Sequence, residues 1–392
     1  MHLLFFSDIT WEHLYQRPQQ LANYLGRHWP VLWIEPATLG SPRKWLPVRK
    51  HEHLHVLSLP QFPHNARNAH VRGISRFLST VPGLRGLLCS IQHFLLRRAM
   101  KHLDIEHQTF GAVVENFQFA SLIEHIRPSV VLFDYIDDAF GFADYPAYVR
   151  EEWRKTIGLA TALTATSSFL KAQLERERSL TVHLVENGVD TSLYQSDAPP
   201  PRPPDLPAAD RPIIIYVGTV SRWFDFELLR SALRHLPDYN FVIVGPVHPD
   251  VGQRLTEMHD FTNLSVLGSR AHTAIPAYLR VSTVGMIPFV RNRLTEGVNP
   301  VKLYEYAAAA LPIVTTAFSD DIEQFRDVAF IGRTREEFLG HLATAVAAAQ
   351  DPGHAARLRA FAVQNDWGMR AGALASLLTQ QMEQHKKPQR SS

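Results

Sequence analysis

Residues 284–316 read VGMIPFVRNRLTEGVNPVKLYEYAAAALPIVTT, and their order of apolar and polar residues indicates the architecture of the chain. The apolar run 284–288 predicts a buried strand, and the polar loop behind it leads into Asn299 and Pro300. Asparagine can cap the free amides of a helix, and proline suits the first helical position. A helix is therefore expected over about 301–309, followed directly by another strand. This order predicts a parallel α/β sheet.

Short apolar runs alternate with longer amphipathic stretches along the rest of the chain. We expect strands at 2–6, 31–34, 55–59, 112–114, 130–133, 162–166 and 182–185, and again at 213–218, 241–245, 264–268, 284–288, 312–316 and 328–332. Between the two series lies 196–212, whose seven prolines exclude a helix and a central strand. The sequence thus predicts two Rossmann-like doubly wound domains, 1–195 and 213–366, joined by this linker and followed by a closing helix and tail at 367–392.

The composition is that of a soluble globular protein. The 392 residues are 45% apolar and 20% charged, with a net charge of +2 that argues against a dedicated nucleic-acid binder. The single cysteine, Cys89, excludes an internal disulfide and fits a reducing compartment. No apolar run is long enough to span a membrane, and the first strand is too short for a signal peptide. We therefore expect a cytoplasmic protein that is soluble or bound to a membrane surface.

The first strand is followed by Ser7-Asp8-Ile9 rather than by a G-x-G-x-x-G turn, and the chain has no Walker A motif. These absences remove the usual support for nicotinamide, flavin and P-loop binding. Ligands of doubly wound sheets bind at the carboxyl ends of the strands, so we expect the two domains to face each other across a cleft.

Lys302 and Glu305 are three residues apart and share one face of the expected helix. A cation near the start of a helix and a carboxylate one turn later reverse the order that the helix dipole prefers. The order makes sense if Lys302 meets phosphate oxygens and Glu305 accepts hydrogen bonds from a sugar diol. The alternative is a surface helix whose polar face happens to hold a Lys and a Glu.

The segment N-P-V-K-L-Y-E-Y-A-A-A-A-L-P-I-V resembles the donor-binding helix of the retaining glycosyltransferases of the GT-B type, in the group-1 family that includes family 4. The glycine turn at 216–218 and the N-G-V-D at 187–190 are similar to motifs of the same family. Trp11, the QRPQQLA stretch and the Y-I-D-D at 135–138 resemble a bacterial polysaccharide subgroup of the teichuronic-acid type.

The resemblance implies a nucleotide-sugar donor, most simply a UDP- or GDP-sugar, in the second domain, with no bound metal or other cofactor. Glu305 would bind the ribose, Gly218 would let the backbone approach the diphosphate, and basic residues would neutralise the departing phosphates. The implied donor-binding residues are Gly218, Arg222, Ser269, Arg270, Arg291, Arg293, Glu296, Asn299, Lys302, Leu303 and Glu305.

The chain departs from the family pattern at three places. Glu296 and Glu305 are separated by eight residues where the family has seven, which puts a sugar contact by Glu296 in doubt. The lysine that commonly follows the glycine turn is absent, with Asp225 near its position, so another residue must supply that phosphate contact. Ala310 replaces the glycine that ends the donor-binding helix, and a left-handed alanine would cost about 1 kcal/mol.

Polar residues behind three strands of the first domain are candidates for the acceptor side, because they follow carboxyl ends of strands. The acceptor-binding candidates are His13, Gln16, Arg17 and Asn116, and the catalytic candidates are Glu115, Asp137 and Asp138. Two alternatives stay open: the aspartate pair could cap the next helix, and Arg17 could brace a neighbouring carboxylate.

Residues 37–103 hold 11 Lys and Arg but one acidic residue, Glu52, which gives +10 against 2 − 10 = −8 for the rest of the chain. The second part of this segment combines basic and apolar residues and could lie on an anionic membrane surface; a solvated crossover helix is the alternative. His51, His53 and His55 would share one face of a strand, where we favour a solvated edge over a metal site.

The sequence therefore predicts a glycosyltransferase that transfers a sugar from a nucleotide-sugar to a glycan or lipid-linked acceptor in bacterial polysaccharide synthesis. A nucleotide-sugar epimerase on the same fold is an alternative enzyme. A non-catalytic sugar-nucleotide or glycan-binding protein is the alternative outside the enzymes, and an oxidoreductase comes third.

Overall fold

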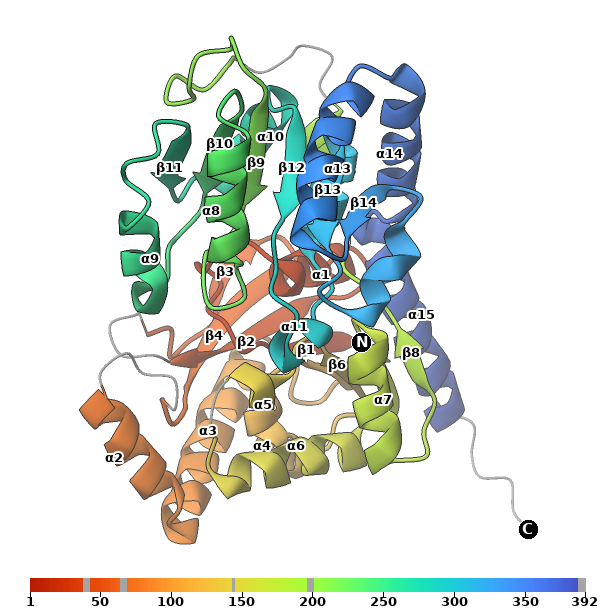
Figure 1. Cartoon of the computed structure of the whole chain (residues 1–392). Helices are drawn as coiled ribbons and strands as arrows, with labels where there is room; N and C mark the ends of the chain where they lie inside the picture. The colour runs from red at the N-terminus through yellow and green to blue at the C-terminus, as the bar shows by residue number, and fades with distance from the viewer. Residues whose placement is uncertain (38–42, 64–68, 143–144, 196–200, 387–392) are drawn as a thin grey trace. The chain divides into compact units, whose positions relative to one another are not determined.

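The computed structural model describes residues 1–37, 43–63, 69–142, 145–195 and 201–386 (Figure 1). The chain forms two compact units. Unit 1 comprises Met1–Glu186 and Arg370–Ser392, and unit 2 comprises Asn187–Met369.

Unit 1 is built around an eight-stranded sheet in the order β3-β4-β2-β1-β5-β6-β7-β8. The strands are β1 (His2–Phe6), β2 (Val31–Ala37), β3 (Val48–His51), β4 (Leu54–Pro60), β5 (Phe110–Val114), β6 (Val130–Tyr135), β7 (Ala162–Ala165) and β8 (Val182–Leu184). All neighbours are parallel except β3 and β4. The inner strands are almost wholly apolar and buried because helices cover both faces of the sheet.

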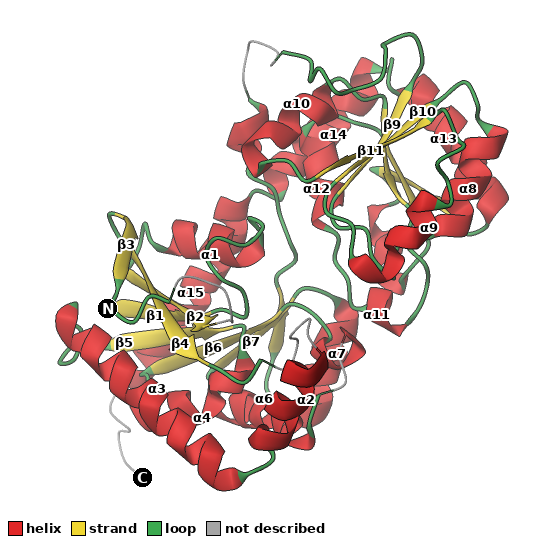
Figure 2. Cartoon of the chain, turned by 90° about the vertical axis from the view of Figure 1, so that its left-hand side faces the viewer, coloured by secondary structure: helices red, strands yellow, loops and turns green. Residues whose placement is uncertain are grey.

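The helices of unit 1 lie in two layers. They are α1 (Arg17–Leu25), α2 (Ala69–Ser79), α3 (Pro82–His102), α4 (Ala120–Ile126), α5 (Ala139–Phe142), α6 (Ala147–Leu159) and α7 (Ser168–Glu177), joined by α15 (Trp367–Lys386) from the end of the chain. Figure 2 shows α3, α4 and α6 on one side of the sheet and α1 and α15 on the other.

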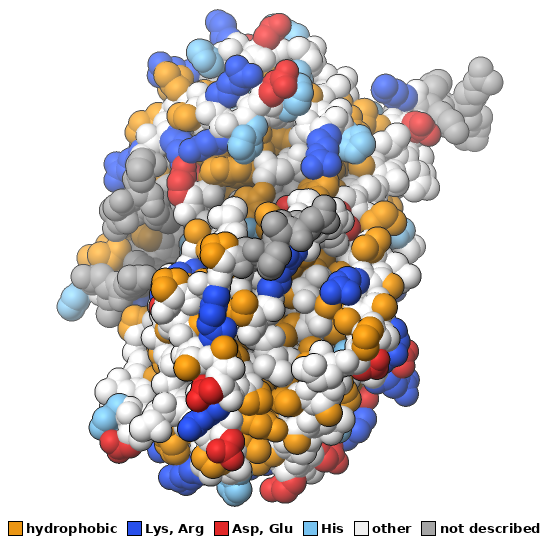
Figure 3. Space-filling view, turned by 90° about the horizontal axis from the view of Figure 1, so that it is seen from above, with side chains coloured by type: hydrophobic (Ala, Val, Ile, Leu, Met, Phe, Trp, Pro, Cys, Tyr) orange, Lys and Arg blue, Asp and Glu red, His pale blue; other side chains and the backbone are white. Residues whose placement is uncertain are grey.

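Unit 2 has a six-stranded parallel sheet in the order β11-β10-β9-β12-β13-β14. The strands are β9 (Ile213–Val217), β10 (Asn240–Val244), β11 (Leu264–Gly268), β12 (Val284–Ile287), β13 (Ile313–Thr316) and β14 (Ala329–Gly332). The helices are α8 (Phe226–His235), α9 (Gly252–Thr256), α10 (Ile275–Arg280), α11 (Arg293–Glu296), α12 (Val301–Ala308), α13 (Arg335–Ala348) and α14 (Pro352–Gln364). In Figure 2, α8, α9 and α13 lie on one side of this sheet and α10, α12 and α14 on the other. Figure 3 shows basic and acidic side chains interspersed over the face seen from above.

The predicted doubly wound fold is confirmed for both units, and each of the predicted strands corresponds to a strand of the structure. The sequence missed β3, which forms an antiparallel hairpin with β4. The prediction that His51, His53 and His55 share one strand is therefore wrong. His51 ends β3, His53 lies in the turn, and His55 belongs to β4.

The start of α12 also differs from the expectation. The residue before the helix is Pro300, and no side chain caps the first amides. Asn299 does not cap because its side chain is held by other partners, described below. At the other end, Ala310 adopts the left-handed conformation with φ 54°, as expected for a position where the family has glycine. The strain is about 1 kcal/mol.

The division of the chain falls at other residues than the predicted boundaries. Unit 2 begins at Asn187, so the residues 187–195 assigned to the end of the first domain lie in unit 2. The first residues of the predicted linker, 196–200, and the tail from 387 lie outside the described residues. From Arg370 onward, α15 belongs to unit 1, which explains why a helix without a following strand ends the chain.

Candidate functional site

The strand order of unit 2 reverses between β9 and β12, since β10 and β11 extend the sheet on one side of β9 and β12 to β14 on the other. In doubly wound folds, ligands bind at the carboxyl ends of the strands beside such a point. The loop after β9 begins at Gly218, and the loop after β12 leads through α11 to α12. These loops and the start of α12 form the candidate site of unit 2.

Lys302 extends from the first turn of α12 to the glycine turn behind β9. Gly218 has φ 138°, and a Cβ atom there would lie 2.5 Å from Cε and 2.7 Å from Nζ of Lys302. The ammonium also lies 5.2 Å from the ring centre of Tyr216 and 5.5 Å from that of Phe289. Burial lowers the pKa of Lys302, and the nearby Glu305 opposes this shift. A glycine is thus required at 218 to make room for a half-buried cation.

The position of Lys302 bears on the lysine that is absent after the glycine turn, whose phosphate contact another residue must supply. Asp225 accepts a hydrogen bond from the amide of Leu228 at 2.9 Å and caps α8, so it has a structural role. Lys302 brings a cation to the glycine turn from a different element. Gly245, after β10, has φ 148°, and a Cβ there would lie 2.1 Å from the carbonyl oxygen of Gly218. The two turns therefore pack backbone against backbone.

Glu305 lies one turn beyond Lys302 with 14% of its side chain exposed. Burial raises the pKa of Glu305, and Lys302 opposes the shift. Nε2 of His272 is 3.8 Å from Oε1 of Glu305, and burial lowers the pKa of this histidine. Burial, followed by the charge of Glu305, raises the pKa of Tyr194. His272 and Tyr194 were missed in the sequence; the only signal for His272 was its place just after the β11 turn.

The predicted base-side residues, Ser269 and Arg270, follow β11. Ser269 is exposed. The guanidinium of Arg270 pairs with Asp205 at 2.5 Å, donates to the hydroxyl of Tyr278 at 2.9 Å and donates to the carbonyl of Leu267 at 2.7 Å. Arg270 therefore fastens the segment around Asp205 to the sheet edge, which is a structural role.

Asn299 and Leu303 also contribute to the structure of unit 2 through hydrogen bonds and core packing. Oδ1 of Asn299 accepts from the amide of Asn187 at 2.9 Å and from the hydroxyl of Tyr304 at 3.1 Å. Leu303 is fully buried in the core, and its amide donates to the carbonyl of Pro300. The side chain of Leu303 is thus unable to contact a ligand, and we do not retain it as a donor-binding residue.

The remaining candidates for donor binding lie in the loop after β9, in the loop after β12 and on α11. Arg222 lies in the loop after β9 and Arg293 begins α11; both side chains are exposed. Arg291 is exposed and pairs with Asp320. Glu296 ends α11 and is half-buried.

In unit 1 the strand order reverses between β1 and β5. The amides of Glu115 and Asn116, directly after β5, both donate to the carbonyl of Phe6 at the end of β1, at 2.9 and 3.0 Å. The carboxyl oxygens of Glu115 are buried and have no hydrogen-bond partner among the described residues. Burial, then the charges of Asp134 and Asp8, raise the pKa of Glu115 well above its usual range. Glu115 is therefore a buried carboxyl group with a raised pKa at the candidate site of unit 1.

Arg17 braces a carboxylate, which was the second of the two readings open from the sequence. Its guanidinium makes two bonds of 3.0 Å to Asp134 and a third, of 2.8 Å, to the carbonyl of Glu186. Asp134 is fully buried and also accepts from the hydroxyl of Thr164 at 2.6 Å. Sequence reasoning missed Asp134, although an aspartate in the otherwise apolar run of β6 was a visible signal.

Asn116 is buried and exchanges hydrogen bonds with the amide of Gln61 at 3.2 and 3.3 Å, while its Oδ1 also accepts from the amide of Gln118. His13 and Gln16 have exposed side chains in the loop between β1 and α1. His13 and Gln16 can therefore reach a ligand, whereas Asn116 stabilises the loop.

The two adjacent aspartates behind β6 point to different surroundings. Asp137 is exposed, whereas Asp138 is buried at the start of α5. A Cβ on Gly141 would lie 3.2 Å from Oδ2 of Asp138, so this carboxylate packs against the helix. Of the pair, Asp137 is the one that a ligand can reach.

The raised pKa of Glu115 predicts a pH-dependent effect on stability. An acid whose folded-state pKa is raised stabilises the fold fully below its unfolded pKa, and this contribution is lost as the pH rises through the folded pKa. Relative to the wild type, Glu115→Gln should therefore become more stable by about 1.4 kcal/mol for each pH unit above about 4.5, up to the folded pKa. Urea unfolding of both proteins across this pH range measures the difference.

The matched control is Glu383→Gln, which changes an exposed glutamate on α15. Its unfolding free energy should run parallel to that of the wild type at every pH. If the unfolding free energy of Glu115→Gln also ran parallel to that of the wild type at every pH, the pKa of Glu115 would not be raised by burial, and the prediction would be wrong.

Comparison with known proteins agrees with the features of unit 2. The model of a protein family described as "Glycosyl transferases group 1" matches residues 211–350, which include the glycine turn, Lys302 and Glu305. The family model thus covers most of unit 2, and residues 211–350 are similar to the group 1 glycosyl transferases. The chain is 26% identical over 165 residues to TuaH of Bacillus subtilis, which carries the name of a teichuronic acid biosynthesis glycosyltransferase. The match spans 41% of this chain and 42% of TuaH, less than half of that relative's length.

Solved structures of similar fold match the chain over nearly its whole length. They include E. coli trehalose-6-phosphate bound with UDP-2-fluoro glucose (TM-score 0.71, 14% identity, 97% of this chain and 99% of that one). Sucrose-phosphate synthase from Thermosynechococcus elongatus gives a TM-score of 0.71 at 15% identity, covering 98% and 100%. Anabaena HepE in complex with UDP gives a TM-score of 0.65 at 15% identity, covering 97% of this chain and 100% of that one. The predicted GT-B fold is thereby confirmed. Among the described residues, no helix is long and apolar enough to cross a membrane.

Proposed function

We propose that this chain transfers a sugar from a nucleotide-sugar, bound by unit 2, to a glycan or lipid-linked acceptor bound by unit 1, with retention of configuration at the transferred sugar. The proposal includes a role in bacterial polysaccharide synthesis and a location in the cytoplasm or on the inner membrane surface. The observation that carries it is the contact of Lys302 with Gly218 beside the strand-order reversal of unit 2, with Glu305 one turn further along the same helix.

In this proposal the donor lies along the start of α12. Lys302 and the free amides at the helix start neutralise the phosphates, because both place positive charge at the same point. Glu305 accepts hydrogen bonds from the ribose hydroxyls, and His272 holds its carboxylate on one side. The exposed arginines Arg222 and Arg293 complete the neutralisation as the nucleoside diphosphate departs.

The remaining donor contacts are arranged around these groups. Arg291 joins the other arginines once it leaves Asp320, Glu296 faces the sugar, and Ser269 lies near the base. UDP is the first nucleotide to test, since solved structures of the same fold contain UDP or a UDP-sugar. No metal is assigned a role in holding the donor.

On the acceptor side, Glu115 and Asp137 are the proposed catalytic carboxyl groups, and His13 and Gln16 bind the acceptor. Glu115 suits the role because a carboxyl group with a raised pKa exchanges a proton with an acceptor hydroxyl more readily than an ordinary carboxylate does. Asp137 is exposed at the neighbouring strand end and suits a contact with sugar hydroxyls.

The experiment has two steps. The first is a thermal-shift screen of UDP, GDP, ADP and dTDP and their sugars, in which a specific ligand at 100 times its Kd adds about 2.7 kcal/mol of stability. The second incubates the stabilising donor with and without a glycan acceptor and follows release of the nucleoside diphosphate. Release that depends on the acceptor supports transfer. Conversion of the donor alone would indicate an epimerase, and binding without turnover would indicate a non-catalytic protein.

A further inference from the structure

Helix α2 exposes its apolar side chains and buries its serines. Ile74 and Phe77 are 60% and 71% exposed, whereas Ser75 and Ser79 are 4% and 0% exposed. A helix that faces water has the opposite pattern, with its polar stripe outside. The apolar face of α2 therefore has the character of a surface that is covered by something other than water.

Helix α3 continues this surface. Its buried residues all lie in the second half, from Gln92 onward, so the first half buries no residue. Leu84, Leu87, Ile91, Phe94, Arg98 and Lys101 follow each other at alternating spacings of three and four, and all six are exposed. This spacing places them on one stripe of the helix, apolar at first and cationic at its end.

The clustering is strong for the described part of the chain. Eight of the sixteen exposed large apolar side chains lie between Ile74 and Phe94. No acidic residue occurs from His53 to Leu103. An apolar surface with a cationic border and without acidic residues matches the interface of a bilayer that contains anionic lipids.

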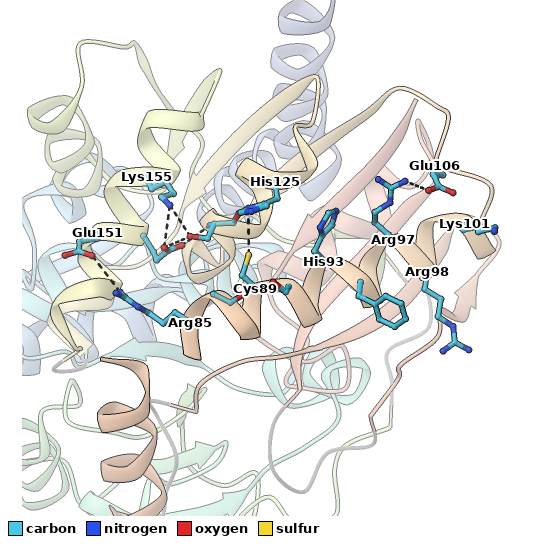
Figure 4. A pocket seen from close by; sticks show the side chains of 15 residues that line it. Arg85, Cys89, His93, Arg97, Arg98, Lys101, Glu106, His125, Glu151 and Lys155 are labelled. Atoms are coloured by element: carbon cyan, nitrogen blue, oxygen red, sulfur yellow. Dashed lines mark hydrogen bonds and ion pairs between the residues drawn. The ribbon is translucent and has the colours of Figure 1, made fainter. Parts of the chain in front are cut away.

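A pocket of about 1040 Å³ is lined by residues of α3, α4 and α6. The basic residues that line it differ in whether an acidic residue pairs with them. Figure 4 shows Arg97 paired with Glu106 and Arg85 paired with Glu151. No ion pair or hydrogen bond within the described residues reaches the side chains of Arg98 or Lys101. Lys101 lies close enough to Glu106 to help lower the pKa of that carboxyl, but neither Arg98 nor Lys101 is held in an ion pair by a described residue, so both can meet an anion at the end of the stripe.

We infer that the face formed by α2 and the exposed stripe of α3 docks on an anionic bilayer, with Phe77, Leu87 and Phe94 among the acyl chains and Arg98 and Lys101 against lipid phosphates. The inference rests on the peripheral membrane association proposed above and names the face responsible. The occupant is a lipid surface rather than a protein, because the apolar part of the stripe suits acyl chains and the cations at its end, with no acidic residue from His53 to Leu103, complement phosphate headgroups.

The test is co-sedimentation of the full chain with vesicles of phosphatidylcholine alone or mixed with phosphatidylglycerol. The wild type should bind the mixed vesicles and bind phosphatidylcholine weakly. Neutralising both cations, as Arg98→Gln with Lys101→Gln, should weaken binding to mixed vesicles about 30-fold, at about five-fold per charge. The pair Phe77→Ser and Phe94→Ser should weaken binding to both kinds of vesicle.

Matched controls lie in unit 2. Arg234→Gln with Arg359→Gln removes two exposed cations, and Val363→Ser removes an exposed apolar side chain, so both should bind vesicles like the wild type. Melting curves confirm that each variant is folded. Two results would overturn the inference: no binding by the wild type, or equal losses in the control and stripe variants.

A third overturning result identifies a protein partner instead. It is self-association of the wild type in solution that Phe77→Ser with Phe94→Ser abolishes, without vesicle binding by either protein. Nucleotide affinity is measured on the same samples. Intact nucleotide binding with no vesicle binding removes this inference and leaves the proposed function; vesicle binding without nucleotide binding does the reverse.

Discussion

Glu305→Ala is expected to weaken the binding of a nucleoside diphosphate by roughly 10- to 150-fold while leaving the fold intact. The reason is that a hydrogen bond to a charged group contributes about 1.5 to 3 kcal/mol, and the substitution removes the carboxylate that would accept from the ribose. Among the described residues, no hydrogen bond to the Glu305 carboxylate holds the fold together, and Nε2 of His272 is 3.8 Å from Oε1 of Glu305. Calorimetric titration with UDP measures the loss.

Two further variants make this result specific. Glu305→Gln keeps the size of the side chain and loses only its charge, so its affinity should lie between those of Glu305→Ala and the wild type. Glu227→Ala removes an exposed glutamate from the first turn of α8 and should bind UDP as the wild type does. Equal affinities of Glu305→Ala and wild type, with equal melting temperatures, would refute the assignment of Glu305.

The features of unit 2 that were predictable depend on neighbours in the sequence. The apolar runs fix the strands, and the three-residue spacing of Lys302 and Glu305 fixes their common helical face. The left-handed Ala310 followed from its position at the helix end. Each of these features depends on backbone geometry over fewer than about two helical turns, which local sequence determines.

The features that were not predictable depend on residues far apart in the chain. The partner of Asn299 is Asn187, 112 residues away, and this contact replaces the expected capping bond. His272 reaches Glu305 from another loop, and the sequence gives no measure of that approach. Likewise, nothing local indicated that α15 would return to unit 1. Only the folded sheet determines which loops meet at its carboxyl edge.

Arg17→Met should cost about 3 to 5 kcal/mol of unfolding free energy, the second large effect that we expect. Asp134 is fully buried, and without Arg17 its carboxylate keeps, among the described residues, the hydrogen bond from the hydroxyl of Thr164. Breaking a buried ion pair from one side leaves an uncompensated charge in a medium of low dielectric constant, which accounts for the cost. Equilibrium unfolding in urea measures the loss.

A variant without both charges separates two contributions to the unfolding free energy: the attraction between Arg17 and Asp134, and the cost of leaving the Asp134 carboxylate buried without Arg17. The double variant Arg17→Met with Asp134→Leu should regain most of the lost stability, because apolar residues of similar volume replace buried ion pairs at little cost. The exposed pair Arg333 and Glu323 is the control: Arg333→Met should cost about 1 kcal/mol or less. A loss below 1 kcal/mol for Arg17→Met would contradict the buried pairing.

Since Arg17 begins α1 and Asp134 lies in β6, the pair holds these elements together beside the carboxyl edge that carries Glu115. A stable double variant with lost transfer activity would then show that the pair positions the acceptor site as well as stabilising the fold.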